Sequence, residues 1–378
     1  MNINQRIQYY LEQRKENQLF RKLTSSNTLV DFSSNDYLGF AKSAWIKQQM
    51  EQDVKLLQQI GSTGSRLLNG NHTIIEALEQ QIANFHYAEA ALFFNSGYNA
   101  NVGLISTVAR KEDIIIYDEK VHASIHVGMQ LSKATLIPFK HNNLNDLSEQ
   151  LLQVKTNGVV FVIVETMYSM DGDIADLKTI AQLCKQYQAN LIIDEAHSIG
   201  LFGEKGRGLA NEQGVEQDCF ARVYTYGKAL GSHGAAVAGS QDLQDYLINF
   251  AKPFIYSTAP LLLDFLSVKH SYNFLQQNKN QLIKLNCLIN YFKEKIKTQN
   301  VVKNIKGIGP IFLFMFNSVE ATKKTASFLQ AQGLDCRAIV YPTVAQNEPR
   351  IRIVLHSYNT TQEIDQLIEL ITSQLQLQ

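Results

Sequence analysis

The stretch V-V-F-V-I-V, residues 159–164, is apolar at every position. A strand with one face in water alternates apolar and polar residues, so this unbroken run is typical of a strand covered on both faces. Similar short apolar runs recur on either side of it: A-A-L-F-F (90–94), I-I-I-Y (114–117), A-T-L-I-P (134–138), L-I-I-D (191–194), R-V-Y-T-Y (222–226) and A-A-V-A-G (235–239).

The intervals between these runs determine how the strands connect. Most intervals have room for a crossover helix, which predicts an α/β fold with a mostly parallel seven-stranded sheet and helices on both faces. The last two runs are only about eight residues apart, which is too short for a crossover. We therefore expect one antiparallel strand at that point.

The pattern changes after Pro260, where a long helical stretch leads into a second region. Two apolar runs alternate there with two helical segments: P-I-F-L-F-M-F (310–316), 319–332, R-I-R-I-V-L (350–355) and 361–376. Three parts are therefore expected: an N-terminal arm and helix (1–40), a large domain (41–260) and a small α+β domain (261–378).

The chain has 378 residues, 45% of them hydrophobic, and a formal net charge of zero. These values predict an ordered globular protein and argue against nucleic-acid or anionic membrane surfaces as partners. No apolar run reaches the ~20 residues of a membrane helix, and the polar first residues differ from a signal peptide. Four scattered cysteines without a C-x-x-C pair favour reduced thiols over disulfides or zinc. We expect a cytoplasmic protein without a metal.

Ligands of an open parallel sheet bind beyond the carboxyl ends of its strands. The polar residues that follow the predicted strands are therefore candidates for a site: Asp118 to His122, Glu165 to Asp173, Asp194 to His197, and Thr225 to Lys228. One lysine, one aspartate and two histidines would meet there. Small residues surround Lys228 in T-Y-G-K-A-L-G-S-H-G-A-A (225–236), which would let a ligand approach its amine.

This set of residues meets the needs of pyridoxal phosphate. The lysine would form the Schiff base, and Asp194 would keep the pyridine nitrogen protonated. The phosphate needs N–H groups at a helix start, which S-G-Y-N-A-N (96–101) would provide, together with the hydroxyl of Thr225.

Each residue alone also has an ordinary structural interpretation. Lys228 could be a solvated lysine, Asp194 a helix N-cap, and Gly97 a turn residue. His122 and His197 could be hydrogen-bonded core histidines. Only their conjunction at consecutive strand ends favours a site.

Two motifs that could indicate a nucleotide-binding function lack the sequence context that such a function requires. D-E-A-H (194–197) is shared with helicases, but the chain contains no G-x-x-x-x-G-K-[ST] loop to hold a nucleotide. The glycine pair in G-I-G-P (307–310) is followed by proline and opens no dinucleotide-binding helix.

Motifs along nearly the whole chain resemble those of the α-oxoamine synthases, a group of fold-type I pyridoxal-phosphate enzymes. They are F-S-S-N-D-Y-L-G (32–39), G-S-T-G-S-R-L-L-N-G-N-H (61–72), L-F-F-N-S-G-Y-N-A-N (92–101), V-H-A-S (121–124), E-T-M-Y-S-M-D-G-D (165–173), D-E-A-H-S-I-G (194–200), T-Y-G-K-A-L-G (225–231), I-Y-S-T (255–258) and Y-P-T-V (341–344).

The resemblance implies four catalytic residues: Lys228 as the Schiff-base lysine, Asp194 at the pyridine nitrogen, His197 at the ring hydroxyl and His122 stacked on the ring. It implies further contacts from Ser169 to the ring substituents, from Gly97, Tyr98 and Thr225 to the phosphate, from Arg21 and Thr343 to substrate, and from Arg352 to the amino-acid carboxylate. The role of Arg352 also agrees with guanidinium chemistry, since a guanidinium binds a carboxylate in bidentate fashion.

The activity implied is that of an acyltransferase that joins L-alanine to a pimeloyl thioester, on coenzyme A or acyl carrier protein, in biotin synthesis. One departure concerns the acyl group: the family often has Arg-Pro-Pro-Thr-Val where this chain has Val340 to Val344. Alternatives are a relative that uses glycine or serine with another acyl-CoA, an aminotransferase, and a non-catalytic scaffold. The first two stay open, whereas the complete lysine, aspartate and histidine set disfavours a scaffold.

The resemblance also implies a homodimer with active sites at the subunit interface. I-Y-S-T (255–258) would bring Ser257 and Thr258 toward the partner's phosphate. The Gly-rich stretch 61–72 could pack closely across a two-fold axis, although the same composition is typical of a surface loop.

Overall fold

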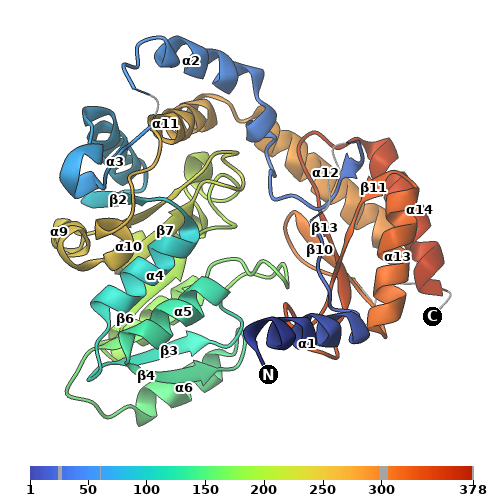
Figure 1. Ribbon diagram of the computed structural model, residues 1–378, viewed down its shortest axis with the longest axis horizontal. Helices are drawn as coiled ribbons and strands as arrows, with labels where there is room; N and C mark the ends of the chain where they lie inside the picture. Colours follow the sequence, from blue (N-terminus) through green and yellow to red (C-terminus); the bar gives the residue numbers. More distant parts are fainter. Residues whose placement is uncertain (24–27, 60, 298–304, 377–378) are drawn as a thin grey trace.

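The computed structural model describes residues 1–23, 28–59, 61–297 and 305–376 (Figure 1). Its helices are α1 Ile3–Glu16, α2 Ala44–Val54, α3 Thr73–Phe85, α4 Gly97–Val108, α5 Ala123–Ser132, α6 Leu144–Gln153, α7 Leu177–Gln186, α8 Leu209–Gln213, α9 Gln241–Phe250, α10 Lys252–Ile255, α11 Leu262–Gln277, α12 Asn280–Lys297, α13 Val319–Ala331 and α14 Thr361–Gln376. Short helical turns cover Phe40–Lys42, Arg66–Gly70, Glu204–Gly206 and Glu216–Asp218.

A seven-stranded sheet with the order β2-β8-β7-β6-β5-β3-β4 forms the larger part of the fold. Its strands are β2 Ala90–Phe94, β3 Ile114–Asp118, β4 Thr135–Phe139, β5 Val160–Glu165, β6 Asn190–Asp194, β7 Cys219–Thr225 and β8 Ala235–Gly239. Strands β3 to β7 pair in parallel, whereas β8 is antiparallel to both β7 and β2. The predicted mostly parallel sheet and its antiparallel exception are confirmed.

Alternate residues of each strand enter different cores, as the period of two requires. In β5, Phe161 and Ile163 pack in a cluster with residues of α4, α5, α9 and α10. Val162 and Val164 pack on the opposite face, in the cluster that includes residues of α3, α6, α7 and α11. Because both faces are covered, these strands are apolar throughout, as the sequence indicated.

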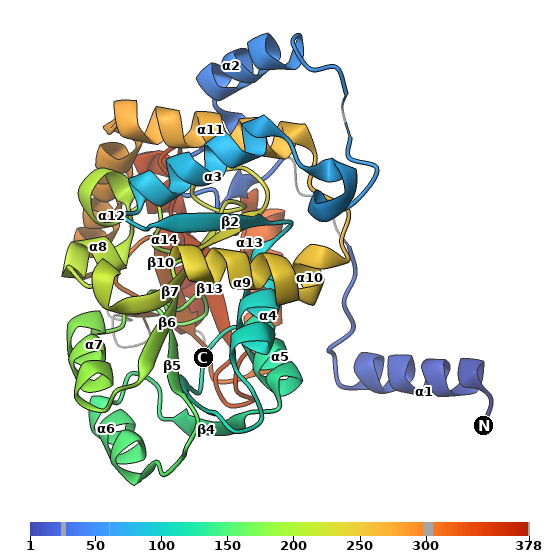
Figure 2. The same cartoon turned by 90° about the vertical axis from the view of Figure 1, so that its left-hand side faces the viewer.

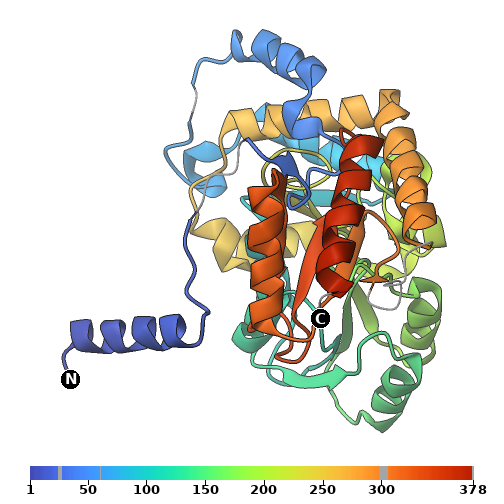
Figure 3. The ribbon, with the colours of Figure 1, turned by 90° about the vertical axis from the view of Figure 1, so that its right-hand side faces the viewer.

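A smaller sheet of order β12-β13-β10-β9 lies in the C-terminal part of the chain. Its strands are β9 Ile305–Lys306, β10 Ile311–Met315, β12 Arg337–Ile339 and β13 Arg350–Val354. Helices α13 and α14 lie side by side over this sheet, in orange and red in Figure 3. A parallel pair, β1 Val30–Asp31 with β11 Leu334–Asp335, joins the N-terminal arm to the C-terminal part.

Helix α11 packs against the large sheet, where the Phe265 ring lies 4.6 Å from that of Phe93 on β2. Helix α1 projects away from the rest of the chain (Figure 2), and none of its residues is buried. Within the described ranges, no helix is both long and apolar enough to cross a membrane.

Candidate active site

The carboxyl ends of five strands meet along one edge of the large sheet. Strand β2 points the same way as β7, because each is antiparallel to β8. Strands β3, β5 and β6 run parallel to β7. Glu165 pairs in register with Asp194 at the ends of β5 and β6, and Thr225 ends β7. This edge therefore gathers the polar residues predicted from the sequence.

The Lys228 amine lies beside the start of helix α4. Its Nζ donates to Thr225 Oγ1 at 3.0 Å. A Cβ on Gly97 would lie 2.5 Å from Thr225 Cγ2, so only glycine lets the helix start approach the end of β7 this closely. Ser96 caps α4 by accepting from the backbone N–H of Asn99 at 3.2 Å. An amine, a hydroxyl and a helix N-terminus thus lie close together, as an anion such as phosphate requires.

Asp194 lies at the centre of the site and is 5% exposed. Its carboxylate accepts hydrogen bonds from Asn101 Nδ2 at 2.8 Å and from the Ala196 N–H at 2.9 Å. The Asn101 amide also donates to Ser124 Oγ at 3.0 Å, and that hydroxyl lies 2.8 Å from His122 Nδ1. One hydrogen-bonded chain therefore links His122 to the buried carboxylate.

The two site histidines differ in environment. His197 is buried, and its pKa lies well below the ordinary value because of burial and the nearby charges of Lys228 and Arg352. Its Nδ1 lies 2.7 Å from the hydroxyl of Tyr37, whose pKa burial raises to about 12. His122 is more exposed, and burial together with the Lys228 charge lowers its pKa.

The Lys228 pKa is lowered by burial, against the opposing charge of Asp194. A lowered pKa makes the neutral amine more accessible, as a nucleophile or general base requires.

Arg352 reaches the site from β13 of the smaller sheet. Its Nε donates to the Ser169 carbonyl at 2.6 Å, and its Nη2 donates to Asn35 Oδ1 at 2.9 Å. Among the described residues no carboxylate forms an ion pair with this guanidinium, which is 6% exposed. An unneutralised buried guanidinium favours a carboxylate ligand.

A cavity of about 350 Å³ lies between these groups. Predicted residues that line it are Gly97, Tyr98, His122, Ser169, Asp194, His197, Thr225, Lys228 and Arg352. The sequence thus identified residues from both sheets that the fold brings to one cavity.

The cavity also has lining residues outside the predicted set: Asn35, Ser96, Asn101, Ser124, Glu165, Met170, Ala196, Gly227, His233 and Gly234. Asn101 lies one helical turn after Gly97, so the i, i+4 spacing could have indicated it. Glu165 ends β5 and begins the candidate range Glu165 to Asp173, but the sequence assigned it no role. Glu165 is 4% exposed, and burial together with the Asp194 charge raises its pKa well above the ordinary value.

A second cavity of about 800 Å³ adjoins the first and shares His122, Glu165, Ser169 and Met170 with it. Arg21 and Thr343 line this second cavity, and Arg21 Nη2 donates to Thr343 Oγ1 at 3.1 Å. These two predicted residues therefore lie together, apart from the lysine.

Ser257 and Thr258 line neither cavity. Thr258 follows α10, and its carbonyl accepts from Asn95 Nδ2 at 3.0 Å. Their expected contact with a partner's phosphate stays a prediction.

The first cavity fits pyridoxal phosphate on its own chemistry. The helix start beside Gly97 and Thr225 suits a phosphate. Asp194, held as an acceptor by Asn101 and Ala196, suits a protonated pyridine nitrogen. The Lys228 amine donates to Thr225 and lines the same cavity.

The model of the aminotransferase class I and II family matches residues 27–371. The chain is 38% identical to the 8-amino-7-oxononanoate synthase of Emericella nidulans, over 97% of this chain and 94% of that protein.

Solved structures show the same fold. That of 8-amino-7-oxononanoate synthase from Francisella tularensis matches with a TM-score of 0.79 and 28% identity, over 93% of this chain and 99% of the other. A serine palmitoyltransferase from Sphingomonas wittichii matches with a TM-score of 0.91 and 24% identity, over 99% and 98% of the two chains. The second match shows the fold alone. The chain belongs to the aminotransferase class I and II family, as a pyridoxal-phosphate-dependent acyltransferase of the group that includes the 8-amino-7-oxononanoate synthases.

Proposed function

We propose that this enzyme condenses L-alanine with a pimeloyl thioester, releasing CO2 and the thiol and giving 8-amino-7-oxononanoate. The observation that carries the proposal is the pair of adjoining cavities with a shared wall. One has the chemistry for an amino acid and the cofactor. The other is larger and opens beside the same reacting region, as a second substrate with a long acyl group requires.

In the first cavity, Arg352 holds the alanine carboxylate. This fixes the Cα–H bond near Lys228, which removes the Cα proton and later returns one. When bound, pyridoxal phosphate supplies an electron sink for the pair left at Cα. Asp194 would pair with the positive charge that this electron sink requires, and hydrogen bonds from Asn101 and Ala196 hold its carboxylate in place.

His122 and His197 orient the reacting groups. His197 lines the first cavity and is held there by the contact of its Nδ1 with the Tyr37 hydroxyl. His122 lines both cavities and would stack on the ring, and the contact of its Nδ1 with Ser124 orients it there.

The acyl thioester occupies the second cavity, with its carbonyl at the shared wall formed by Glu165, Ser169 and Met170. Arg21 offers a cation to an anionic end of the substrate. Val340 stands where relatives often have arginine, so the recognition of the distal carboxylate would rest on Arg21 and Thr343.

A second candidate is a condensation of serine with a long acyl-CoA. Val340, which stands where the 8-amino-7-oxononanoate synthases often have arginine, favours it. Sequence similarity to the 8-amino-7-oxononanoate synthases favours the first candidate.

The test is a panel of amino acids and thioesters with the purified holoenzyme. Visible absorbance would be followed during titration with alanine, glycine and serine, and thiol release would then be measured with pimeloyl-CoA, pimeloyl-acyl carrier protein, acetyl-CoA and palmitoyl-CoA. Highest kcat/KM with alanine and a pimeloyl thioester is expected. Preference for serine with palmitoyl-CoA would replace the proposal with its alternative.

We further infer a homodimer in the cytoplasm, with Ser257 and Thr258 near the partner's cofactor. Apolar residues exposed on α1, including Ile7, Tyr10 and Leu11, support an intermolecular contact. Sedimentation of the holoprotein at micromolar concentration tests this; a monomer that keeps its cofactor would contradict it.

A further inference from the structure

The turn between β5 and α7 carries two residues of the wall shared by both cavities, Ser169 and Met170. Within the turn, the Tyr168 N–H donates to the Asp173 carbonyl at 3.0 Å, and the Gly172 N–H donates to the Tyr168 carbonyl at 2.8 Å. Its position relative to both sheets therefore determines the shape of the wall.

The C-terminal part of the chain holds one side of this turn. Arg350 on β13 donates from Nη1 to the Met170 carbonyl at 2.8 Å and to Asp171 Oδ1 at 3.1 Å. The Ile308 N–H donates to the Gly172 carbonyl at 3.0 Å. These contacts alone would let the turn follow any movement of the smaller sheet.

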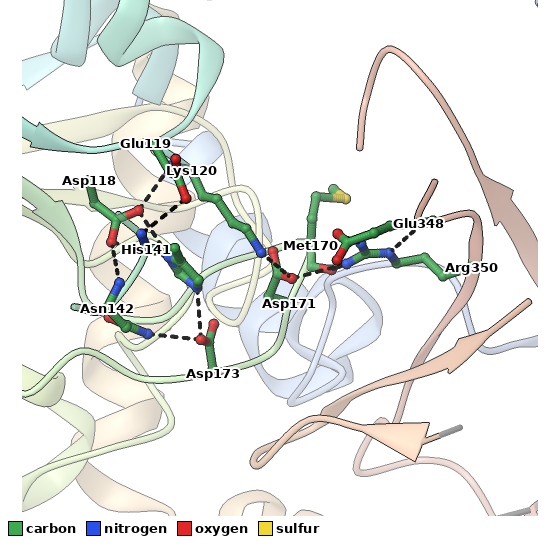
Figure 4. A network of polar contacts seen from close by, with 10 residues as sticks. All are labelled: Asp118, Glu119, Lys120, His141, Asn142, Met170, Asp171, Asp173, Glu348 and Arg350. Carbon is green, nitrogen blue, oxygen red and sulfur yellow. Dashed lines mark hydrogen bonds and ion pairs between the residues drawn. The ribbon is translucent and has the colours of Figure 1, made fainter. Parts of the chain in front are cut away.

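His141 holds the other side to the large sheet (Figure 4). Its Nδ1 lies 2.9 Å from Asp118 Oδ1 at the end of β3, and its Nε2 lies 2.8 Å from Asp173 Oδ2 in the turn. Asn142 makes a parallel link, donating from its N–H to Asp118 Oδ2 and from Nδ2 to Asp173 Oδ2, both at 2.8 Å.

Both nitrogens of His141 face carboxylate oxygens. An ionised carboxylate only accepts hydrogen bonds, and a neutral imidazole has a single N–H. Asp118 also accepts from the backbone N–H groups of Lys120 and Asn142. The ring can therefore satisfy both contacts only as an imidazolium.

The charges around the ring agree with this. Burial alone lowers the pKa of His141, but the hydrogen bonds and charges of Asp118 and Asp173 outweigh it and raise the pKa to about 9. The Glu119 carboxylate accepts from the backbone N–H of His141, and the Tyr168 ring lies edge-on to the imidazole, with its centroid 4.5 Å away. The nearby Lys120 is paired with Asp171.

We propose that His141 is a positioning residue for the acyl thioester, tying the turn 168–173 to the end of β3 so that Ser169 and Met170 form the shared wall. The inference rests on the proposed function, since it assigns the second cavity to the thioester. His141 touches no substrate itself; it lines neither cavity. Binding of alanine in the first cavity depends less on His141, because Arg352 of the smaller sheet donates to the Ser169 carbonyl.

The sign of the pH effect follows from the raised pKa. The stabilising contribution of protonated His141 is complete below its unfolded-state pKa of about 6.5. It is lost as pH rises through its folded-state pKa of about 9. Loss of one proton removes one donor and frees one of the two carboxylates. We expect the KM for the thioester to rise at alkaline pH while the KM for alanine changes little.

The first experiment measures the imidazole directly, by ¹⁵N NMR of histidine-labelled holoenzyme between pH 6 and 10. The His141 signal would be assigned by its absence in His141→Gln. Two protonated nitrogens at neutral pH are expected. A single protonated nitrogen at pH 7 would overturn the proposal.

The second experiment compares kinetics across pH. His141→Gln should raise the thioester KM about tenfold at neutral pH, as loss of a charged hydrogen bond implies, and should remove the alkaline rise. Asp173→Asn keeps a hydrogen-bonding partner but removes a charge, so the rise should shift to lower pH. His270→Gln is the matched control, because it breaks a histidine–carboxylate pair with Asp53 outside both cavities.

Failure of this inference is distinguishable from failure of the proposed function. Wild-type turnover with unchanged thioester KM in His141→Gln and Asp173→Asn would reject the positioning role alone. Absence of product from every thioester would reject the function, and the NMR titration would still decide the state of the ring. Thermal unfolding of each variant identifies any that fail to fold.

Discussion

The two cavities differ in how the chain builds them. The first lies at the ends of hydrogen-bonded strands, where register places Asp194 beside Glu165 and Thr225 nearby. The second is lined by segments far apart in the sequence, such as Arg21 and Thr343. A sheet edge fixes its side chains through the backbone ladder, whereas the second cavity depends on loops. The difference indicates a rigid centre for the chemistry and a more variable cavity for the acyl group.

Replacing Lys228 with alanine should produce the largest effect, because it removes the amine that moves the Cα proton. Turnover with any thioester should fall by at least about a thousandfold, within the range of general-base contributions. Thiol release from the holoenzyme is the measurement. Turnover within tenfold of wild type would show that the rigid cavity is not the catalytic centre.

Arg352→Gln should have the next largest effect, on the amino-acid side only. Removing a buried charge that pairs with a carboxylate is expected to raise the alanine KM about a hundredfold. Arg352→Lys, which keeps the charge but not the bidentate geometry, should lie between this variant and wild type. An equal rise in the thioester KM would contradict the separation of the two cavities.

The sequence predicted the first cavity well because its signals are local. A strand followed at once by Asp194, or by Thr225 and Lys228, predicts both the element and the side-chain position. The parallel topology then brings these residues together without further information. Asn101 and Glu165 lie within stretches that the sequence singled out, 96–101 and 165–173, but received no role, because their roles depend on side-chain partners.

The second cavity and the turn at its wall were less predictable. The contact of Arg21 with Thr343 joins residues separated by most of the chain, and only the family resemblance indicated that either residue belongs to a site. The link from Asp118 through His141 to Asp173 depends on the register of β3 with β4 and β5. No motif spacing encodes such a register.

Arg21→Gln should have a moderate effect on the thioester side. The residue is exposed, and its contribution to an anionic substrate is screened by solvent, so a thioester KM about fivefold higher is expected. The alanine KM should be unchanged, and the difference should shrink at high salt. A larger effect for pimeloyl than for palmitoyl thioesters would sharpen the assignment of this cavity to a substrate with an anionic end.

Glu165→Gln should have the smallest effect on activity, although Glu165 lines both cavities. Burial and the charge of Asp194 raise the Glu165 pKa well above its ordinary value, with Lys228 opposing. The folded protein therefore favours the protonated, neutral carboxyl, which glutamine imitates in shape and charge. A change in kcat/KM below about threefold is expected at neutral pH, within the usual range for a substitution that keeps charge and volume.

The stability of this variant tests the same assignment without any substrate. A raised folded pKa means that Glu165 contributes stability below the unfolded value of about 4.5 and loses it as pH rises toward the folded pKa. Glutamine has no such loss. The Tm of Glu165→Gln relative to wild type should therefore increase from pH 5 to pH 8, measured by thermal unfolding of the holoenzymes. A difference that falls with pH would mean that Glu165 is held ionised, as the partner of a cation at the shared wall.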